Sequence, residues 1–346
     1  MLERADGVPE QGAGLSVWPN GVRALRALGF DRLVDAAPRV SGAIRRANGR
    51  PLATHDYTDL EDRYGEPLIA LARGDLLEAE LERLGEAHVR FGAEVEAIDE
   101  RELVLADGSR RTAELIVGAD GRHSTVRAEL LGDGEPRASG LIAFRGIAAW
   151  DAELPAGEWW GPGVVAGLVP LGGGRVYWYV SFRGDGDAEF GDRVDWFSAP
   201  LPEIVGSTPA AEVLRHELFD REPAKRVAGE GTALVGDAAH PMLPFLGQGA
   251  CSALEDAVAL GSAAALPSLD AALELYSEQR AAAGNLLIRG SRQAARAALI
   301  GPGPLRALRN GVVSTLPSTM HLRRLEPILA EQAEAEEATE PEEAER

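Results

Sequence analysis

Thr232-Ala233-Leu234-Val235-Gly236-Asp237-Ala238-Ala239-His240-Pro241 is followed closely by Gly247-Gln248-Gly249, and these two segments decide the fold. The apolar run predicts a short buried strand, Gly236-Asp237 predicts a turn, and the Ala-rich run at 250–264 predicts a helix that opens at the second segment. The first N–H groups of a helix have no partner within the helix, so they favour anions. The sequence therefore predicts a strand–loop–helix unit with a ligand site at the start of the helix.

Composition narrows the class of protein. A chain of 346 residues that is 45% hydrophobic can bury a large core and suits about two domains. A formal net charge of -20 makes nucleic acid a poor partner. The single cysteine, Cys251, excludes an internal disulfide and is expected to be a packed side chain. The Glu-rich segment 331–346 is expected to be a disordered, solvating acidic tail.

The sequence carries no signal for a membrane or a metal. It has no run of about 20 apolar residues and no charged-then-apolar leader, so we expect a soluble cytoplasmic protein without a transmembrane segment. Its six histidines and single cysteine lack ligand spacing, so no metal is expected. The assembly is expected to be a monomer or a homodimer.

Beyond residue 133 the pattern becomes strand-like. The segments 141–148, 164–171 and 175–182 predict strands with Gly-rich joints, and the chain therefore combines an α/β unit with a mostly antiparallel sheet. In the last of these strands, Arg175, Tyr177, Tyr179 and Ser181 alternate and share one face.

Three further segments accompany the opening unit in chain order. They are Gly12-Ala13-Gly14-Leu15-Ser16-Val17-Trp18-Pro19-Asn20, Arg73-Gly74-Asp75-Leu76-Leu77, and Leu115-Ile116-Val117-Gly118-Ala119-Asp120-Gly121-Arg122-His123-Ser124-Thr125-Val126-Arg127. Together with the unit at 232–249 they resemble the single-component FAD-dependent aromatic monooxygenases, the para-hydroxybenzoate and salicylate hydroxylase group. The resemblance covers roughly residues 1–300.

The resemblance implies a Rossmann-like α/β domain of the GR2 type that binds FAD, interleaved with a β-sheet domain that roofs the flavin and binds the substrate. The expected FAD-binding domain comprises residues 1–38, 71–133 and 225–300. The expected substrate domain comprises residues 39–70 and 134–224. A C-terminal helical segment at 301–330 and the tail at 331–346 complete the expected organisation.

The resemblance also assigns the flavin site. Asp237, after Gly236, matches the Asp that binds the ribityl chain, although a turn or N-cap Asp is the plainer alternative. The helix start at Gly247, Gln248 and Gly249 is expected to point N–H groups at the flavin ring, with Pro241 stiffening the loop beside it.

Two other segments are expected to approach the cofactor. Asp120 and Gly121 follow a strand end, where open α/β sheets bind ligands, and the family places the FAD pyrophosphate and the nicotinamide there. Arg73 matches a phosphate-binding Arg just before a predicted helix over Asp75–Leu84, which Asp75 is placed to cap. Arg127 is expected to face the same phosphates or to be an ordinary surface Arg.

The start of the chain departs from the family. A Rossmann-type domain has a GxGxxG fingerprint followed by a second strand that ends in a ribose-binding acid. Met1-Leu2-Glu3-Arg4 resembles the end of that second strand, with Glu3 as the acid and Arg4 beside the cofactor. We therefore expect the fingerprint to lie upstream of residue 1, in a chain that is truncated or whose start is assigned late; the alternative is genuine loss of the pyrophosphate cradle.

Candidate substrate residues are Phe144, Arg175, Tyr177 and Tyr179, although aromatic residues on strands are more often core. Catalytic residues are harder to nominate. His240, next to Pro241, is expected either to line the active site or to pack against the loop. No His or carboxylate is placed well enough in the sequence to be named as the general base.

The implied chemistry needs FAD, NADH or NADPH, O2 and a small aromatic or other electron-rich ring. In the family, NAD(P)H reduces the flavin, and a flavin C4a-hydroperoxide transfers a hydroxyl group to the ring in a dry pocket. Two alternatives stay open: a related flavin reductase or epoxidase, and a non-catalytic remnant of an FAD fold. A flavin halogenase is disfavoured because its catalytic Lys lies near the start of the chain, whereas the lone lysine here is Lys225.

Overall fold

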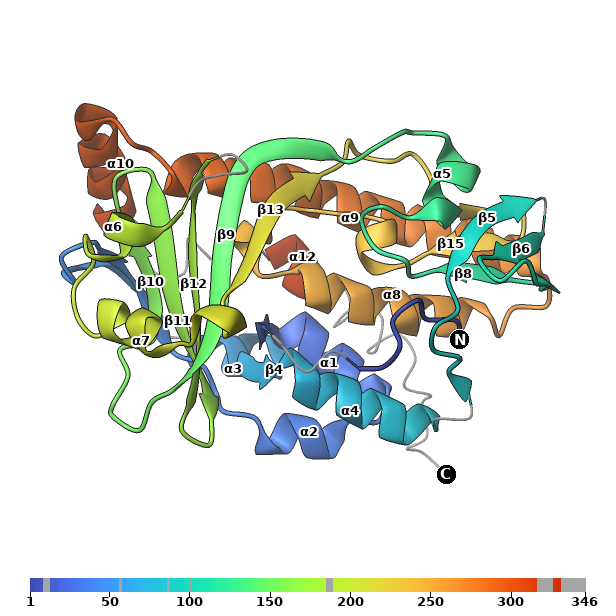
Figure 1. Cartoon of the computed structure of the whole chain (residues 1–346), viewed down its shortest axis with the longest axis horizontal. Coiled ribbons are helices and arrows are strands. Elements are labelled where there is room, and N and C mark those ends of the chain that lie inside the picture. The colour runs from blue at the N-terminus through green and yellow to red at the C-terminus, as the bar shows by residue number, and fades with distance from the viewer. Residues whose placement is uncertain are drawn as a thin grey trace, which may run out of the picture.

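The computed structural model describes residues 1–8, 13–55, 58–85, 88–99, 101–184, 189–315 and 326–330. A large twisted sheet lies beside a smaller α/β part, and the long helix α9 (Leu269–Ala298) runs along both (Figure 1). Within these ranges no helix, α9 included, is long and apolar enough to cross a membrane. The expected tail at 331–346 lies outside the described residues. Of the expected segment at 301–330, the structure describes α10 (Gly303–Thr315) and α12 (Glu326–Ala330).

The large sheet has seven strands. Their spatial order is β13 (Leu214–Asp220), β9 (Arg137–Ala149), β12 (Arg175–Arg183), β11 (Val164–Gly172), β10 (Gly157–Trp160), β2 (Gly42–Arg46) and β3 (Pro51–His55). All neighbours are antiparallel except β10 and β2, which confirms the mostly antiparallel sheet. The sequence did not predict β10, which is only four residues long, or β13, in which charged residues interrupt the apolar pattern.

One face of this sheet forms the largest apolar core. Trp159, Trp178 and Phe182 lie there almost fully buried, and the short helices α6 (Gly191–Val194) and α7 (Leu201–Ser207) cover them. Alternation along the strands directs the remaining side chains to the opposite face, toward the α/β part. The sheet is therefore buried on both faces, and its second face is available to form a site between the two parts.

The α/β part holds the strand–loop–helix unit. Strand β15 (Thr232–Leu234) pairs in parallel with β8 (Ile116–Gly118) and antiparallel with β14 (Ala228–Gly229). Helices α8 (Gly249–Ala263), α5 (Thr125–Leu131) and α9 pack around them. β8 is an edge strand of this small sheet, and Val117 at its centre is 44% exposed.

The remaining elements complete both parts. They are β1 (Gly14–Val17), α1 (Pro19–Ala27), α2 (Asp31–Ala36), α3 (Thr58–Tyr64), β4 (Ile69–Ala72), α4 (Arg73–Leu84) and the meander β5 (Val95–Asp99), β6 (Glu102–Leu105) and β7 (Arg110–Thr112). Near the start of the chain, Leu2 forms an isolated parallel bridge with Arg90. Helix α1 packs closely on α8, because a Cβ at Gly21 would lie 2.8 Å from Cys251 Sγ. Burial raises the pKa of the Cys251 thiol to about 12, as suits a packed side chain.

Asp75 differs from its expected role. The sequence places it at the start of a helix as the cap, but α4 begins two residues earlier, and its N-cap residue Ala72 makes no side-chain bond. Asp75 instead forms an ion pair with Arg175 across to the large sheet, with Arg175 NH2 2.7 Å from Asp75 Oδ2. The reason is tertiary: a cation on β12 lies within reach of the first turn.

A buried carboxylate links β13 to β9 and α9 by hydrogen bonds and makes the stability of the fold depend on pH. Asp220 is fully buried and accepts hydrogen bonds from Arg137 on β9, at 2.9 Å, and from Arg292 on α9, at 2.6 Å. Burial alone would raise the pKa of Asp220, but the two guanidinium groups outweigh it and hold that pKa below its usual range.

A lowered pKa in the folded state stabilises the fold above the ordinary Asp value of about 3.9 and ceases to do so as pH falls through that value. We therefore expect the difference in unfolding free energy between the wild type and Asp220→Asn to be largest near neutral pH and to shrink below about pH 4. Urea denaturation at a series of pH values measures it. A difference that stays constant down to pH 3 would contradict this role of Asp220.

Candidate functional site

The Gly-Asp turn follows β15 directly and is held from beneath. Gly236 has φ 58°, a conformation that favours glycine, and residues 236–238 form a single 3-10 turn. The N–H of Gly236 donates to Asp256 Oδ2 on α8, at 2.7 Å. The turn thereby presents Asp237 outward while the alanines that follow are buried.

Asp237 combines solvent access with close protein surroundings. The residue is exposed to solvent. Many protein atoms nevertheless lie around its carboxyl group, and this partial removal from water raises the pKa of Asp237. The positive charges of Arg122, Arg73 and Arg145 act in the opposite direction. These cations come from three different elements, so Asp237 lies where the turn, α4 and the large sheet converge.

The start of α8 has the geometry that the sequence predicts. Gly247 adopts φ 65°, and the N-cap residue Gln248 makes no side-chain capping bond to the first turn. The Gln248 side chain turns inward instead, where its Oε1 accepts from Asn20 Nδ2 on α1, at 3.1 Å. Two buried atoms here, Asn20 Oδ1 and Gln248 Nε2, have no hydrogen-bond partner within the described part of the chain.

His240 belongs to a buried ionic network beneath the loop. Its Nε2 lies 2.5 Å from Asp256 Oδ2, and Arg280 on α9 donates from Nε to the other oxygen of Asp256, at 2.6 Å. Arg280 NH2 also lies 3.2 Å from Glu255 Oε2. Of the two expected roles of His240, packing against the loop is the one that this geometry shows, and the adjacent Pro241 is likewise buried.

Arg127 is neither a surface residue nor free to face a ligand. It is 1% exposed, and its NH1 donates to the carbonyl oxygens of Ala238 and Ala239, at 3.0 and 2.5 Å. Its Nε and NH2 both donate to Asp133. The guanidinium is therefore occupied in holding the back of the Gly-Asp turn, which sequence spacing could not reveal.

The Asp120-Gly121 segment lies between the end of β8 and the start of α5. Asp120 accepts from the hydroxyl of Ser124 and from the N–H of Thr125, the latter at 2.8 Å, while Ser124 caps α5 by accepting from the N–H of Arg127. Gly121 has φ 76°, as a tight turn requires. The Asp120 carboxylate is thus engaged with its own helix, although its side chain stays exposed.

The remaining candidate cofactor residues are Arg73, Glu3 and Arg4. Arg73 begins α4 and is exposed. Glu3 is half-buried, and its Oε1 accepts from the N–H of Ala5, at 2.8 Å; Arg4 is exposed.

The second face of the large sheet carries a row of polar groups. Glu158, Gly167, Tyr179 and Arg145 occupy paired positions on four adjacent strands. The Tyr179 hydroxyl donates to Glu158 Oε1, at 2.5 Å. The ring of Tyr179 can reach across β11 because Gly167 there has no side chain: a Cβ at this position would lie 2.3 Å from the ring. Burial raises the pKa of Glu158, against the opposing hydrogen bonds from Tyr179 and Trp160.

The structure separates the four candidate substrate residues. Tyr177 and Tyr179 lie together on this face, with ring centroids 5.9 Å apart, and Tyr179 packs in a cluster with Phe245 of the Gly-Asp loop. Arg175 is engaged by Asp75 at the first residue of β12. Phe144 is on the opposite face, packed against Phe190 with centroids 4.7 Å apart, so it does not share a site with the tyrosines.

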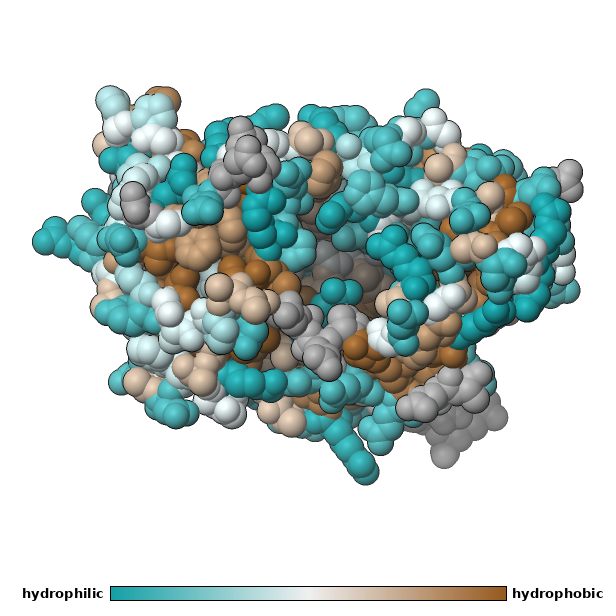
Figure 2. Space-filling model, viewed as in Figure 1, coloured by the Kyte–Doolittle hydropathy of each residue, from teal (hydrophilic) through white to brown (hydrophobic). Residues whose placement is uncertain are grey.

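Two residues missed by the sequence also lie on this face. Arg145 occupies β9, and His216 occupies β13 two positions from the partner of Arg145. Figure 2 shows a hollow beside this end of the sheet, between β13 and the α/β part. The alternation of side chains along β9 could have indicated that Arg145 lies on this face. No such indication existed for His216, because its strand β13 was not predicted.

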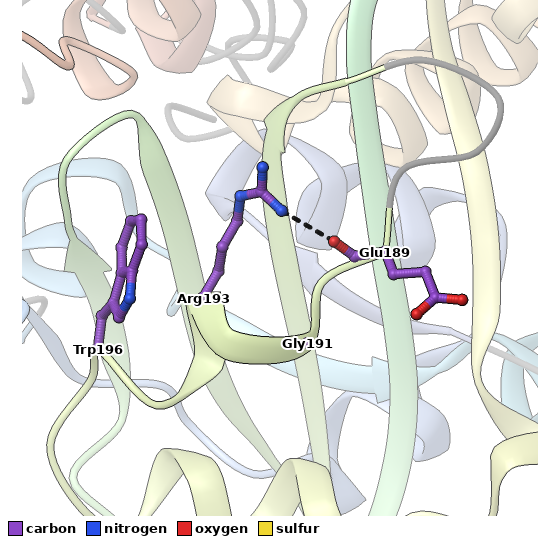
Figure 3. A pocket seen from close by; sticks show the side chains of 4 residues that line it. All are labelled: Glu189, Gly191, Arg193 and Trp196. Carbon is purple, nitrogen blue, oxygen red and sulfur yellow. Dashed lines mark hydrogen bonds between the residues drawn. The ribbon is translucent and has the colours of Figure 1, made fainter.

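A separate shallow pocket lies on the other side of the sheet, at α6 (Figure 3). It has a volume of about 420 Å³ and is lined by Glu189, Gly191, Arg193 and Trp196. The guanidinium of Arg193 lies 4.2 Å from the ring centroid of Phe182 and donates to the carbonyl of Glu189, at 2.9 Å. None of the residues that the sequence nominates for binding lines it. Across the described ranges, no group of His, Cys, Asp and Glu side chains has the arrangement of a metal site.

Comparison with known proteins defines the class. Residues 1–291 match the family described as FAD binding domain. The chain is 35% identical over 309 residues to an aurachin C monooxygenase/isomerase of Stigmatella aurantiaca, covering 84% of this chain and 81% of that protein. It is 33% identical over 282 residues to a 3-amino-4-hydroxybenzoate 2-monooxygenase of Streptomyces cremeus, covering 75% and 71%.

Solved structures of FAD-dependent enzymes share the fold of this chain. The crystal structure of Klebsiella pneumoniae HpxO, complexed with FAD and uric acid, superposes with a TM-score of 0.84 at 26% identity, covering 96% of this chain and 89% of that chain. The fold and the relatives therefore define an FAD-dependent monooxygenase. This chain belongs to the FAD-binding domain family, and the resemblance seen in the sequence is confirmed.

Proposed function

We propose that this chain is an NAD(P)H-consuming, FAD-dependent monooxygenase that uses O2 to hydroxylate a small aromatic or other electron-rich ring. The observation that carries the proposal is the convergence of two surfaces. The accessible Asp237 and the uncapped start of α8 lie beside a sheet face that presents Tyr179 and Arg145. A cofactor and a ring substrate held there would meet between the two parts.

The residues present fit a flavin. Asp237 can accept hydrogen bonds from hydroxyl groups, the start of α8 offers N–H groups to an electron-rich edge, and Arg73 offers a cation to phosphate. Asn20 Oδ1 and Gln248 Nε2, buried beside that helix start and without a partner among the described residues, support a ligand there. When bound, FAD supplies hydride acceptance from NAD(P)H and oxygen transfer from O2.

The chain's own residues have other tasks. The aromatic and apolar side chains around Tyr179, including Phe245 and Leu243, keep water from the reacting region. Arg145 and Tyr179 orient a ring that carries N–H or O–H groups. Urate and 3-amino-4-hydroxybenzoate, which the names of relatives specify, have such groups, so we propose this substrate class.

Substitution of Asp237 tests the proposal. Hydrogen bonds to a charged group contribute about 1.5–3 kcal/mol, so Asp237→Ala is expected to weaken FAD binding about tenfold or more. Quenching of flavin fluorescence on titration measures the affinity. Ring-stimulated NAD(P)H oxidation and O2 consumption, with urate and 3-amino-4-hydroxybenzoate as probes, measure the activity.

Asp62→Ala is the matched control, because Asp62 is an exposed Asp on α3 that is not among the candidate cofactor residues. We expect it to bind FAD like the wild type. Equal affinity in Asp237→Ala would remove this residue from the cofactor site. Failure of the wild type to bind FAD or to respond to any ring would reject the proposed function.

A further inference from the structure

His216 is a histidine whose surroundings the cofactor does not explain. It lies on β13, opposite Ala143, on the sheet face that also carries Arg145 and Tyr179. Its ring is half-buried, and its Nδ1 atom is fully buried with no hydrogen-bond partner among the described residues. A buried polar atom without a partner costs about 1–3 kcal/mol, so such an atom in a native structure usually has a use.

The charges around His216 come from three elements. They are Arg145 on β9, Arg122 after β8 and Arg73 at the start of α4. Burial lowers the pKa of His216, and these cations lower it further. The lowered pKa favours the neutral imidazole, which has a lone pair on one nitrogen. On its own strand, Arg215 and Glu217 alternate to the other face.

The same cations also surround the carboxylate of the Gly-Asp turn. Arg122, Arg73 and Arg145 all act on Asp237, so His216 and Asp237 border one cation-rich site between the large sheet and the α/β part. Three guanidinium groups around a neutral base would stabilise an anion formed next to it.

We propose that His216 is a catalytic residue that contacts the substrate and accepts the proton of its ring O–H or N–H. The bond from that hydrogen to the ring oxygen or nitrogen breaks, a new N–H bond forms on the imidazole, and its electron pair stays on the ring as an anion. Arg145, Arg122 and Arg73 hold that anion, and the imidazolium then releases the proton to water. The ring anion is the electron-rich form that accepts oxygen. This inference rests on the proposed function and adds to it the base and the substrate class: rings with an acidic O–H or N–H.

The test measures ionisation of a bound ring as well as turnover. The probe is 3-amino-4-hydroxybenzoate, whose ultraviolet spectrum changes when its O–H ionises. In the FAD-loaded wild type, we expect difference spectra to show the bound anion at neutral pH. In His216→Asn, we expect the apparent pKa of the bound ring to rise by about one pH unit or more. Loss of a general base typically costs 10²–10⁴-fold, so kcat at pH 7 should fall about 10²-fold and recover as pH rises.

Two variants guard against a structural effect. His216→Gln is a second replacement that keeps a polar side chain and is expected to show the same rise in pKa and the same loss of rate. His88→Asn is the matched control, because His88 is an exposed histidine that the proposed site does not use. It is expected to change kcat less than twofold.

The outcomes separate the two proposals. Unchanged turnover and an unchanged pKa of the bound ring in either His216 variant that folds would overturn the role of His216 and leave the proposed function standing. Absence of any difference spectrum with the wild type, despite bound FAD, would overturn the role of His216 together with the substrate class. A pH-dependent loss in both His216 variants, with a normal His88→Asn, would support it.

Discussion

Asp256→Asn is expected to unfold at a temperature roughly 5–10 °C below that of the wild type, with a loss of about 3–5 kcal/mol in the free energy of unfolding. The Asp256 carboxylate is fully buried and accepts from the N–H of Gly236 and from Arg280 Nε, with His240 Nε2 2.5 Å away. An asparagine has one acceptor oxygen and one NH2 group. Whichever way it turns, its NH2 would face a donor.

Loss of the negative charge of Asp256 adds to the loss of these hydrogen bonds. Arg280 is almost fully buried, and its remaining ionic partner would be Glu255, with NH2 3.2 Å from Oε2. Removing one partner of a buried ion pair leaves an uncompensated charge, which is why the expected loss is large. Thermal unfolding followed by circular dichroism measures it.

Asp99→Asn is the control for Asp256→Asn. Asp99 forms an ion pair with Arg110 at 3.1 Å, but their side chains are 66% and 48% exposed. Exposed pairs contribute about 0–1 kcal/mol, so Asp99→Asn is expected to unfold within about 2 °C of the wild type. Equal shifts for the two variants would show that the network beneath the turn contributes no more than a surface contact.

Arg127→Met is expected to destabilise the fold by about 3 kcal/mol and to weaken FAD binding at the same time. Methionine fills much of the buried volume but leaves the carbonyl oxygens of Ala238 and Ala239 without this donor. It also removes one cation from Asp133, which keeps Arg221 NH1 at 2.9 Å. Because these carbonyls belong to the Gly-Asp turn, its loosening should reach Asp237.

Denaturation and FAD titration together test the Arg127 prediction. Arg110→Met, at a half-exposed position, should alter neither quantity appreciably. Arg127→Lys should be intermediate, because an ammonium group cannot reproduce the fork that bridges Asp133 and two carbonyls. A fall in stability with unchanged FAD affinity would separate Arg127 from the cofactor site.

Most of the fold and part of the site could be predicted from sequence. The strand, the Gly-Asp turn and α8 follow from local periodicity and glycine placement, and the three long strands of the sheet appear within a few residues of their expected bounds. These signals are local, so one sequence suffices to find them.

Tertiary contacts decided the rest. The inward role of Arg127 depends on two carbonyls more than 100 residues away along the chain, and the engagement of Asp75 depends on Arg175 on another sheet. His216 lies on β13, a strand in which charged residues interrupt the apolar pattern, so the strand was not predicted. Phe144 lies on β9 opposite Val180 of β12, and it therefore occupies the other face of the sheet from Tyr179. Pattern alone fixes which residues of one strand share a face; it does not fix how the faces of different strands align.

The position of β8 at the edge of the small sheet affects how readily the purified protein self-associates. Val117 on β8 is 44% exposed, and one long side of β8 pairs with no strand in the described part of the chain. Such an edge offers a template for another chain. Self-association should therefore grow with protein concentration and with warming. Dilute, cool preparations would keep the chains apart long enough for flavin loading to compete with aggregation.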